Sequence, residues 1–110
     1  MPLDTEREII RILLDYMKKN NISNKNKEKI YNIVLKIDYK TELQRERFIR
    51  NYGLKPKEFK KESLSDIARN SNVTPSAIRG SVYAVRHALS YVSDEDFLVL
   101  KKIYETEIKK

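Results

Sequence analysis

Apolar residues recur along this chain at helical spacing, and the pattern predicts an all-α protein. In residues 5–19 the apolar positions fall on one helical face, and they are Ile9, Ile12, Leu13, Tyr16 and Met17. Further helices are predicted over residues 26–38, 42–52, 64–70, 75–92 and 94–108. Glycine occurs only twice and proline three times, so few positions interrupt these helices.

The other helices carry their own apolar stripes. Residues 26–38 are expected to bury Ile30, Ile33, Val34 and Ile37. Residues 42–52 carry Leu43, Phe48, Ile49 and Tyr52, and this helix should stop at Gly53, a residue type favoured just after a helix end. The last helix is expected to bury Phe97, Leu100, either Ile103 or Tyr104, and Ile108.

Helix starts are well marked by Ser or Thr followed three residues later by an acid or an amide. The four pairs are Thr5 with Glu8, Thr41 with Gln44, Ser63 with Asp66, and Ser93 with Asp96. Each fits a capping box, in which the two side chains satisfy backbone N–H groups at the first turn. Four such pairs ahead of amphipathic segments support the predicted helix boundaries.

Residues 63–89 have the features of a helix-turn-helix. Ala68 is small where two helices must cross closely, and Asn72 tolerates the positive φ of a tight turn. Val73 is expected to be the apolar plug between the helices, while Thr74 caps the second helix and Pro75 occupies its first turn. An ordinary helical hairpin with a polar turn is the alternative interpretation.

The second helix of this unit divides into an inner and an outer face. Its inner face is predicted to be Ile78, Val82, Val85 and Leu89. The residues left for other faces are Ser76, Ala77, Arg79, Gly80, Tyr83, Arg86 and His87.

Composition narrows the range of functions. The net charge of +7 favours a polyanionic partner, nucleic acid before an acidic protein or a membrane surface. Without Cys there is no disulfide, thiolate zinc site or Cys nucleophile, and a single His excludes a multi-His metal site. The first residues are acidic and no long apolar run follows, so we expect no signal peptide, no membrane span and a cytoplasmic, nucleoid-associated protein.

The stretch before the helix-turn-helix carries a family resemblance. Residues 47–54 read Arg-Phe-Ile-Arg-Asn-Tyr-Gly-Leu, a basic linker of eight residues follows, and residues 63–68 read Ser-Leu-Ser-Asp-Ile-Ala. In order and spacing, residues 41–90 resemble region 4 of bacterial sigma-70-type factors. The resemblance implies a domain that places its second helix in DNA and can dock on RNA polymerase.

The resemblance has departures that change what it implies. After the cap, the family's run of Arg, Glu and Arg is replaced by residues 75–80, Pro-Ser-Ala-Ile-Arg-Gly, which keep only the apolar Ile78 and Arg79. The family's promoter preference is therefore not carried over. Residues 1–40 are too few for the upstream sigma regions, so a stand-alone region-4-like protein is implied. The Arg-His-Ala-Leu ending is also similar to the DNA-binding helix of sporulation response-regulator effector domains.

The sequence therefore predicts a sequence-specific, double-stranded DNA-binding transcription regulator. Arg79 is the expected base reader, with Ser76, Ala77, Gly80 and Tyr83 beside it in the major groove. The expected phosphate contacts are Arg69, Thr74, Arg86 and the basic loop residues Lys55, Lys57, Lys60 and Lys61. For the loop lysines, a solvated surface is the alternative, and Tyr83 and Tyr91 could instead pack against a neighbouring helix.

The sequence also allows other functions. A module that docks on RNA polymerase with little DNA readout is the competing interpretation. Residues 1–40 are expected to form a helical extension ahead of a domain of residues 41–110, and the Ile9–Met17 stripe could form a homodimer. His87 has no partner for catalysis or metal binding, and Asp94–Asp96 reads as a helix cap. No catalytic residue, metal or cofactor is predicted.

Overall fold

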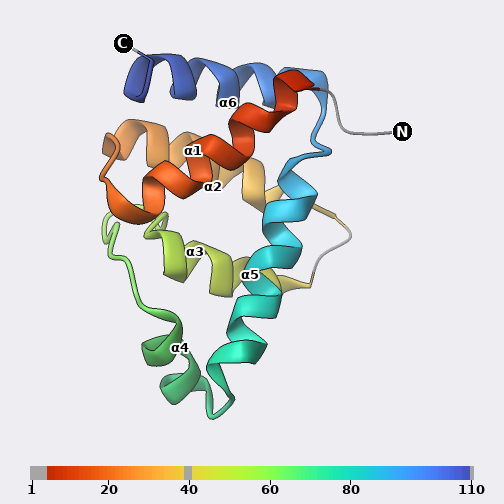
Figure 1. Ribbon diagram of the computed structural model, residues 1–110. Coiled ribbons are helices and arrows are strands. Elements are labelled where there is room, and N and C mark those ends of the chain that lie inside the picture. Colours follow the sequence, from red (N-terminus) through yellow and green to blue (C-terminus); the bar gives the residue numbers. More distant parts are fainter. Residues whose placement is uncertain (1–4, 39–40, 110) are drawn as a thin grey trace.

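The protein consists of helices throughout the described residues, which are 5–38 and 41–109 of a computed structural model. A short 3-10 turn, Thr5–Arg7, leads into six helices: α1 (Glu8–Lys19), α2 (Asn24–Leu35), α3 (Glu42–Tyr52), α4 (Leu64–Ser71), α5 (Pro75–Leu89) and α6 (Asp94–Glu107). Figure 1 shows their arrangement. The predicted all-α bundle is confirmed. None of the described helices combines the length and apolar character that a membrane crossing requires.

Three of the four predicted caps are present. Thr41 and Gln44 form a complete capping box at α3, with hydrogen bonds of 3.2 and 3.3 Å. Ser63 and Ser93 accept hydrogen bonds from the backbone N–H groups of Asp66 and Asp96. Each of these helices therefore begins where its sequence signal placed it.

The other two helix starts differ from the prediction. The 3-10 turn displaces the start of α1, so Arg7 rather than Thr5 occupies the N-cap position, and the side chain of Thr5 lies outside the part of the chain that the structure describes. Helix α2 begins two residues early, because the Ser23 hydroxyl accepts from the Asn26 N–H at 3.2 Å. Ser23 lies inside the polar run that separates α1 from α2, so its capping role was missed.

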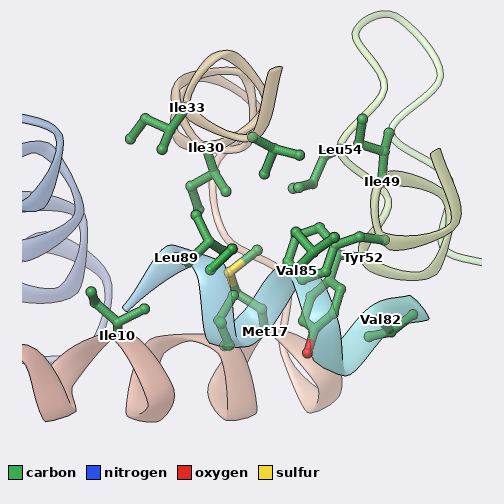
Figure 2. Close-up of a cluster of buried hydrophobic side chains, with 14 of the residues drawn as sticks. Ile10, Met17, Ile30, Ile33, Ile49, Tyr52, Leu54, Val82, Val85 and Leu89 are labelled. Atoms are coloured by element: carbon green, nitrogen blue, oxygen red, sulfur yellow. The ribbon is translucent and has the colours of Figure 1, made fainter. Parts of the chain in front are cut away.

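The helices form two groups around one continuous core. Helices α3, α4 and α5 pack on one another, whereas α6 lies against α1 and α2. Contacts of α1 with α5 and of α2 with α3 join the groups. Figure 2 shows Ile10 and Met17 of α1 and Ile30 and Ile33 of α2 in one cluster of buried side chains with Val85 and Leu89 of α5. Described residues of the expected N-terminal extension therefore contribute to the same buried core as the helices that follow.

The stripe expected to allow dimerisation through α1 is occupied within the chain. Met17 is 1% exposed and Leu13 is equally buried, because α5 and α6 cover this face. Ile12, which lies about 200° around the helix from Ile10, is instead 41% exposed. The proposed Ile9–Met17 dimer surface is therefore wrong.

Leu43 was also assigned wrongly to the core. Five residues separate it from Phe48, which places the two side chains about 140° apart around α3. Phe48 is 0% exposed and stacks on Tyr52 with ring centroids 4.4 Å apart, whereas Leu43 is 53% exposed. In α6, Phe97, Leu100 and Ile103 are buried, so Ile103 rather than Tyr104 fills the core position.

Helices α4 and α5 are joined by a tight turn, residues 72–74, as predicted. Asn72 adopts the left-handed conformation with φ 58°, and the Thr74 hydroxyl accepts from the Ala77 N–H at 3.3 Å. Ala68 is 2% exposed between the helices. Val73 is 39% exposed and is not a plug, because Ile67 and Ile78, each 0% exposed, already fill the core at this end.

Ala68→Leu is expected to lower the free energy of unfolding by about 1–3 kcal/mol, because added volume has no room at this packed position. Val73→Ala serves as the matched control and should change the free energy of unfolding by less than about 0.5 kcal/mol, since Val73 lies at the surface. Urea unfolding followed by circular dichroism measures both. Equal stability of Ala68→Leu and the wild type would place Ala68 outside the helix crossing.

Candidate nucleic-acid interface

The outer side of α5 presents a continuous exposed face. Ser76, Gly80, Tyr83 and His87 follow one another at i, i+4, i+7 and i+11, and Arg79 flanks them; all five are exposed. We call these five residues the α5 face. The opposite side is fixed by Ile78, Val82, Val85 and Leu89, which are all buried as predicted. Burial of the inner side therefore determines which residues face outward.

The beginning of the α5 face combines small residues with one long cation. A Cβ atom built on Gly80 meets no atom within 4 Å, and the neighbouring Ser76 and Ala77 are exposed. Arg79 forms no ion pair with any described residue. The sequence contains no acidic residue between Asp66 and Asp94. The outer side of α5 therefore combines small side chains with one long cation and has no carboxylate of its own.

Arg69 reaches the surface from the neighbouring helix. Its side chain is 74% exposed and forms an ion pair with Asp66 of the preceding turn at 3.2 Å. Such an exposed pair contributes little to folding and can exchange for a phosphate. Thr74 is exposed at the N-terminus of α5, where its hydroxyl already caps the helix.

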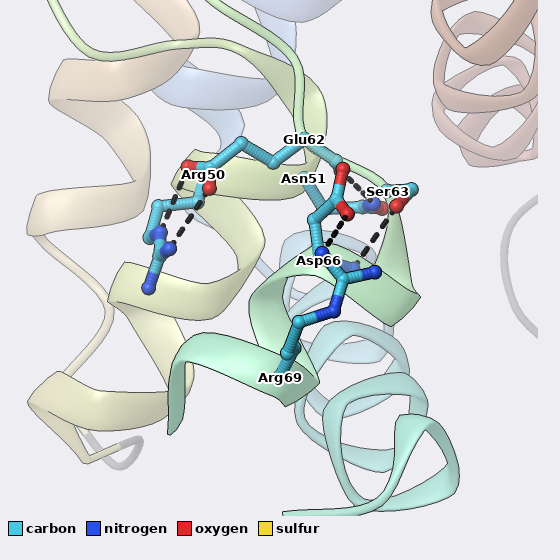
Figure 3. A network of polar contacts seen from close by, with 6 residues as sticks. All are labelled: Arg50, Asn51, Glu62, Ser63, Asp66 and Arg69. Atoms are coloured by element: carbon cyan, nitrogen blue, oxygen red, sulfur yellow. Dashed lines mark hydrogen bonds and ion pairs between the residues drawn. The ribbon is translucent and has the colours of Figure 1, made fainter. Parts of the chain in front are cut away.

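A polar network ties the start of α4 to α3 (Figure 3). Arg50 holds Glu62 with two hydrogen bonds of 2.9 and 2.8 Å, and the hydrogen bonds from Arg50 keep the pKa of Glu62 below its usual value. The Asn51 amide donates to the Glu62 carbonyl at 2.9 Å, next to the Ser63 cap. This anchor sets the position of α4, which in turn supports α5.

The side chain of Arg86 is mostly buried and makes its contacts within the protein. Its side chain is only 11% exposed, and its guanidinium donates to the Asp15 carboxylate of α1 at 2.9 Å and to the Tyr52 hydroxyl of α3 at 3.2 Å. Burial opposes the charge, but Tyr52 and Asp15 outweigh it and raise the pKa of Arg86. The predicted phosphate contact at Arg86 is therefore not available in this structure.

Tyr83 lies at the surface between two cations. Its ring is 5.6 Å from the Lys18 ammonium of α1 and 5.5 Å from the Arg86 guanidinium, and the side chain is 51% exposed. Tyr91 is 59% exposed and contacts the His87 ring edge-on at 5.1 Å. Neither tyrosine is buried against a neighbouring helix. Lys18 was missed because nothing in the local sequence reveals that α1 ends beside α5.

The basic loop divides into two kinds of lysine. Lys57 and Lys60 are exposed, and Lys55 pairs with Glu58 at 3.1 Å on the surface. The Lys61 ammonium instead donates to the carbonyls of Met17 and Asn20 at the end of α1. These hydrogen bonds cap the C-terminus of α1, and burial lowers the pKa of Lys61.

A second lysine, Lys27, is also held in the fold. It is 5% exposed, with its ammonium 5.8 Å from the centre of the Phe59 ring. The sequence pattern indicates no structural role for Lys27, because a lysine on a helix is ordinarily solvated. The packing of the basic loop against α2 is what buries it.

Within the described ranges, no three His, Cys, Asp or Glu side chains are grouped so that they could hold a metal ion. Comparisons with protein-family models, curated proteins and solved structures find no match to this chain.

Arg86→Ala is expected to lower the free energy of unfolding by about 1–3 kcal/mol, because it leaves the buried Tyr52 hydroxyl without its partner. Asp15→Ala should cost less than about 1 kcal/mol, since Asp15 is half exposed and water replaces the lost contact. Urea denaturation of both variants measures the difference. The reverse order of the two losses would contradict the assignment of Arg86 to the core.

Proposed function

We propose that this protein binds double-stranded DNA sequence-specifically and regulates transcription, with α5 lying in the major groove. The observation that carries the proposal is the exposed α5 face, where small residues surround Arg79 on a helix that itself carries no carboxylate. The major groove, about 12 Å wide, admits an α-helix whose outer residues reach base edges. Arg79 can form two hydrogen bonds to one guanine, while Ser76 and Ala77 contact neighbouring bases.

Phosphate contacts would come from residues on either side of α5. Arg69 of α4 is exposed, and Lys18 of α1 lies beside Tyr83. Lys55, Lys57 and Lys60 are also exposed, so these lysines can add salt-dependent affinity without base preference. Arg86 and Lys61 are already held by hydrogen bonds within the protein, so the proposed phosphate contacts do not include them.

The sequence resemblance supports the same assignment. The α3–α4–α5 unit is the segment that resembles sigma region 4, and its two last helices are joined by a short turn with a capped second helix. Docking on RNA polymerase remains the competing function. Capture of polymerase that resists salt, together with no retention on DNA at low salt, would favour docking over DNA binding.

Arg79→Ala is expected to cost about 1–3 kcal/mol of binding free energy on the preferred site and to relax selectivity at one base pair. The site is first selected from random DNA with the purified wild-type protein. Fluorescence anisotropy then compares both proteins on a panel of single-base substitutions. An equal loss of affinity across the whole panel would make Arg79 a phosphate contact and contradict its role in base readout.

Gly80→Glu is expected to abolish DNA binding while the protein stays folded. A side chain at position 80 would project into open space, so the fold should tolerate glutamate there. In the complex, the glutamate would enter the major groove of the DNA and bring a negative charge close to the bases. Asn21→Glu is the matched control, since it makes the same charge change at an exposed position between α1 and α2. Equal binding by the two variants would exclude α5 from the interface.

A further inference from the structure

A groove lies between α2 and α6, on elements that contribute nothing to the α5 face. Its volume is about 460 Å³, and Ile33 of α2 and Val99 and Leu98 of α6 supply its apolar lining. Leu98 is 60% exposed, the most exposed of the large apolar side chains among the described residues. Apolar lining combined with a protruding leucine indicates a surface suited to another apolar side chain.

Lysines outnumber carboxylates around this groove. Lys29, Lys36 and Lys102 line it together with Glu95 and Asp96. Asp96 is largely covered, with its side chain 14% exposed, and it pairs with Lys36 at 2.7 Å. Lys29 and Lys102 are exposed. The groove therefore favours a ligand that carries negative charge beside an apolar anchor.

The chain itself carries such a ligand on α3. Leu43 is 53% exposed in the first turn of that helix. Glu42 and Glu46 are exposed next to it, four residues apart on one side of the helix. This surface is an exposed apolar side chain flanked by two carboxylates, the complement of the groove in both polarity and charge.

We propose that a second copy of this chain occupies the α2–α6 groove with its Leu43, and that Glu42 and Glu46 of that copy face Lys29 and Lys102. The contact joins two different surfaces, so it is head-to-tail: one copy keeps a free Leu43 and the other keeps a free groove, and further copies can add at both ends. The inference is separate from DNA binding, because neither surface includes a residue of the α5 face. Association would nonetheless place several α5 helices in one assembly, and so raise the affinity for DNA that carries several sites.

The test is sedimentation equilibrium of the full chain, without DNA, over a range of concentrations at low salt. The wild type is expected to show a mass above that of the monomer that rises with concentration. Leu43→Ser on one surface and Leu98→Glu on the other should each weaken association at least about tenfold. Ile12→Ser is the matched control, because Ile12 is exposed but lies on neither surface, and it should associate as the wild type does.

Charge exchange provides the decisive measurement. The double variant Glu42→Lys with Glu46→Lys and the double variant Lys29→Glu with Lys102→Glu should each be monomeric alone. Mixed in equal amounts, they should associate as strongly as the wild type, because each exchanged surface meets its complement. Circular dichroism checks that each variant is folded.

Three outcomes would overturn the proposal. A wild type that stays monomeric at every concentration is one, and association that survives both leucine substitutions is another. The third is a mixture of the two charge variants that remains monomeric although both are folded. A loss of DNA binding by Arg79→Ala leaves the association unchanged, so failure of the DNA-binding proposal and failure of this one are distinguishable.

Discussion

The burial of the inner side of α5 is the constraint on which the rest of the structure depends. This helix contacts α3, α4 and α1, and Ile78, Val85 and Leu89 are each 0% exposed. Interiors are packed closely enough that a rotation of α5 would open voids along its whole length. The rotational setting of α5 is therefore fixed by its apolar residues, and Arg79 and Tyr83 point outward as a consequence. An exposed face that is set by core packing is preorganised for binding, because no ordering of the helix remains to be done.

The basic residues of the chain divide according to what surrounds them. Arg50 and Arg86 are held by carboxylates or a buried hydroxyl, and Lys61 caps a helix end, so these three contribute to the fold. Arg69, Arg79 and the outer lysines of the loop remain at the surface. The net charge of +7 thus overstates the positive charge that is accessible to a phosphate. A cation that is held within the fold cannot neutralise a DNA phosphate and so releases no counterion. The salt dependence of the proposed DNA binding should therefore reflect only the basic residues at the surface.

The sequence predicted the helices, the turn at Asn72 and most of the caps because these depend on neighbouring residues. It failed where a distant element decides the outcome. Ile12 and Leu43 are apolar and helical in spacing, but the positions of α5 and α6 determine which side of each helix is covered. Arg86 has the same local pattern as a phosphate contact, and only its approach to Asp15 and Tyr52 reveals its role. Arg79 lies on the exposed side of α5, as the apolar spacing of that helix indicated, and its role as base reader stays a prediction.

The two glycines show how a fold requirement differs from a functional one. Gly53 ends α3 with φ 68°, and a Cβ there would lie 2.9 Å from Lys61 Cγ, so the turn into the basic loop demands glycine. Gly80 lies inside α5, where a Cβ would meet nothing and where glycine costs about 1 kcal/mol relative to alanine. Neither the backbone conformation nor the packing explains why position 80 is a glycine. Gly80 lies beside Arg79 on the exposed α5 face, and in the proposed DNA complex the missing side chain would let the helix approach the groove closely.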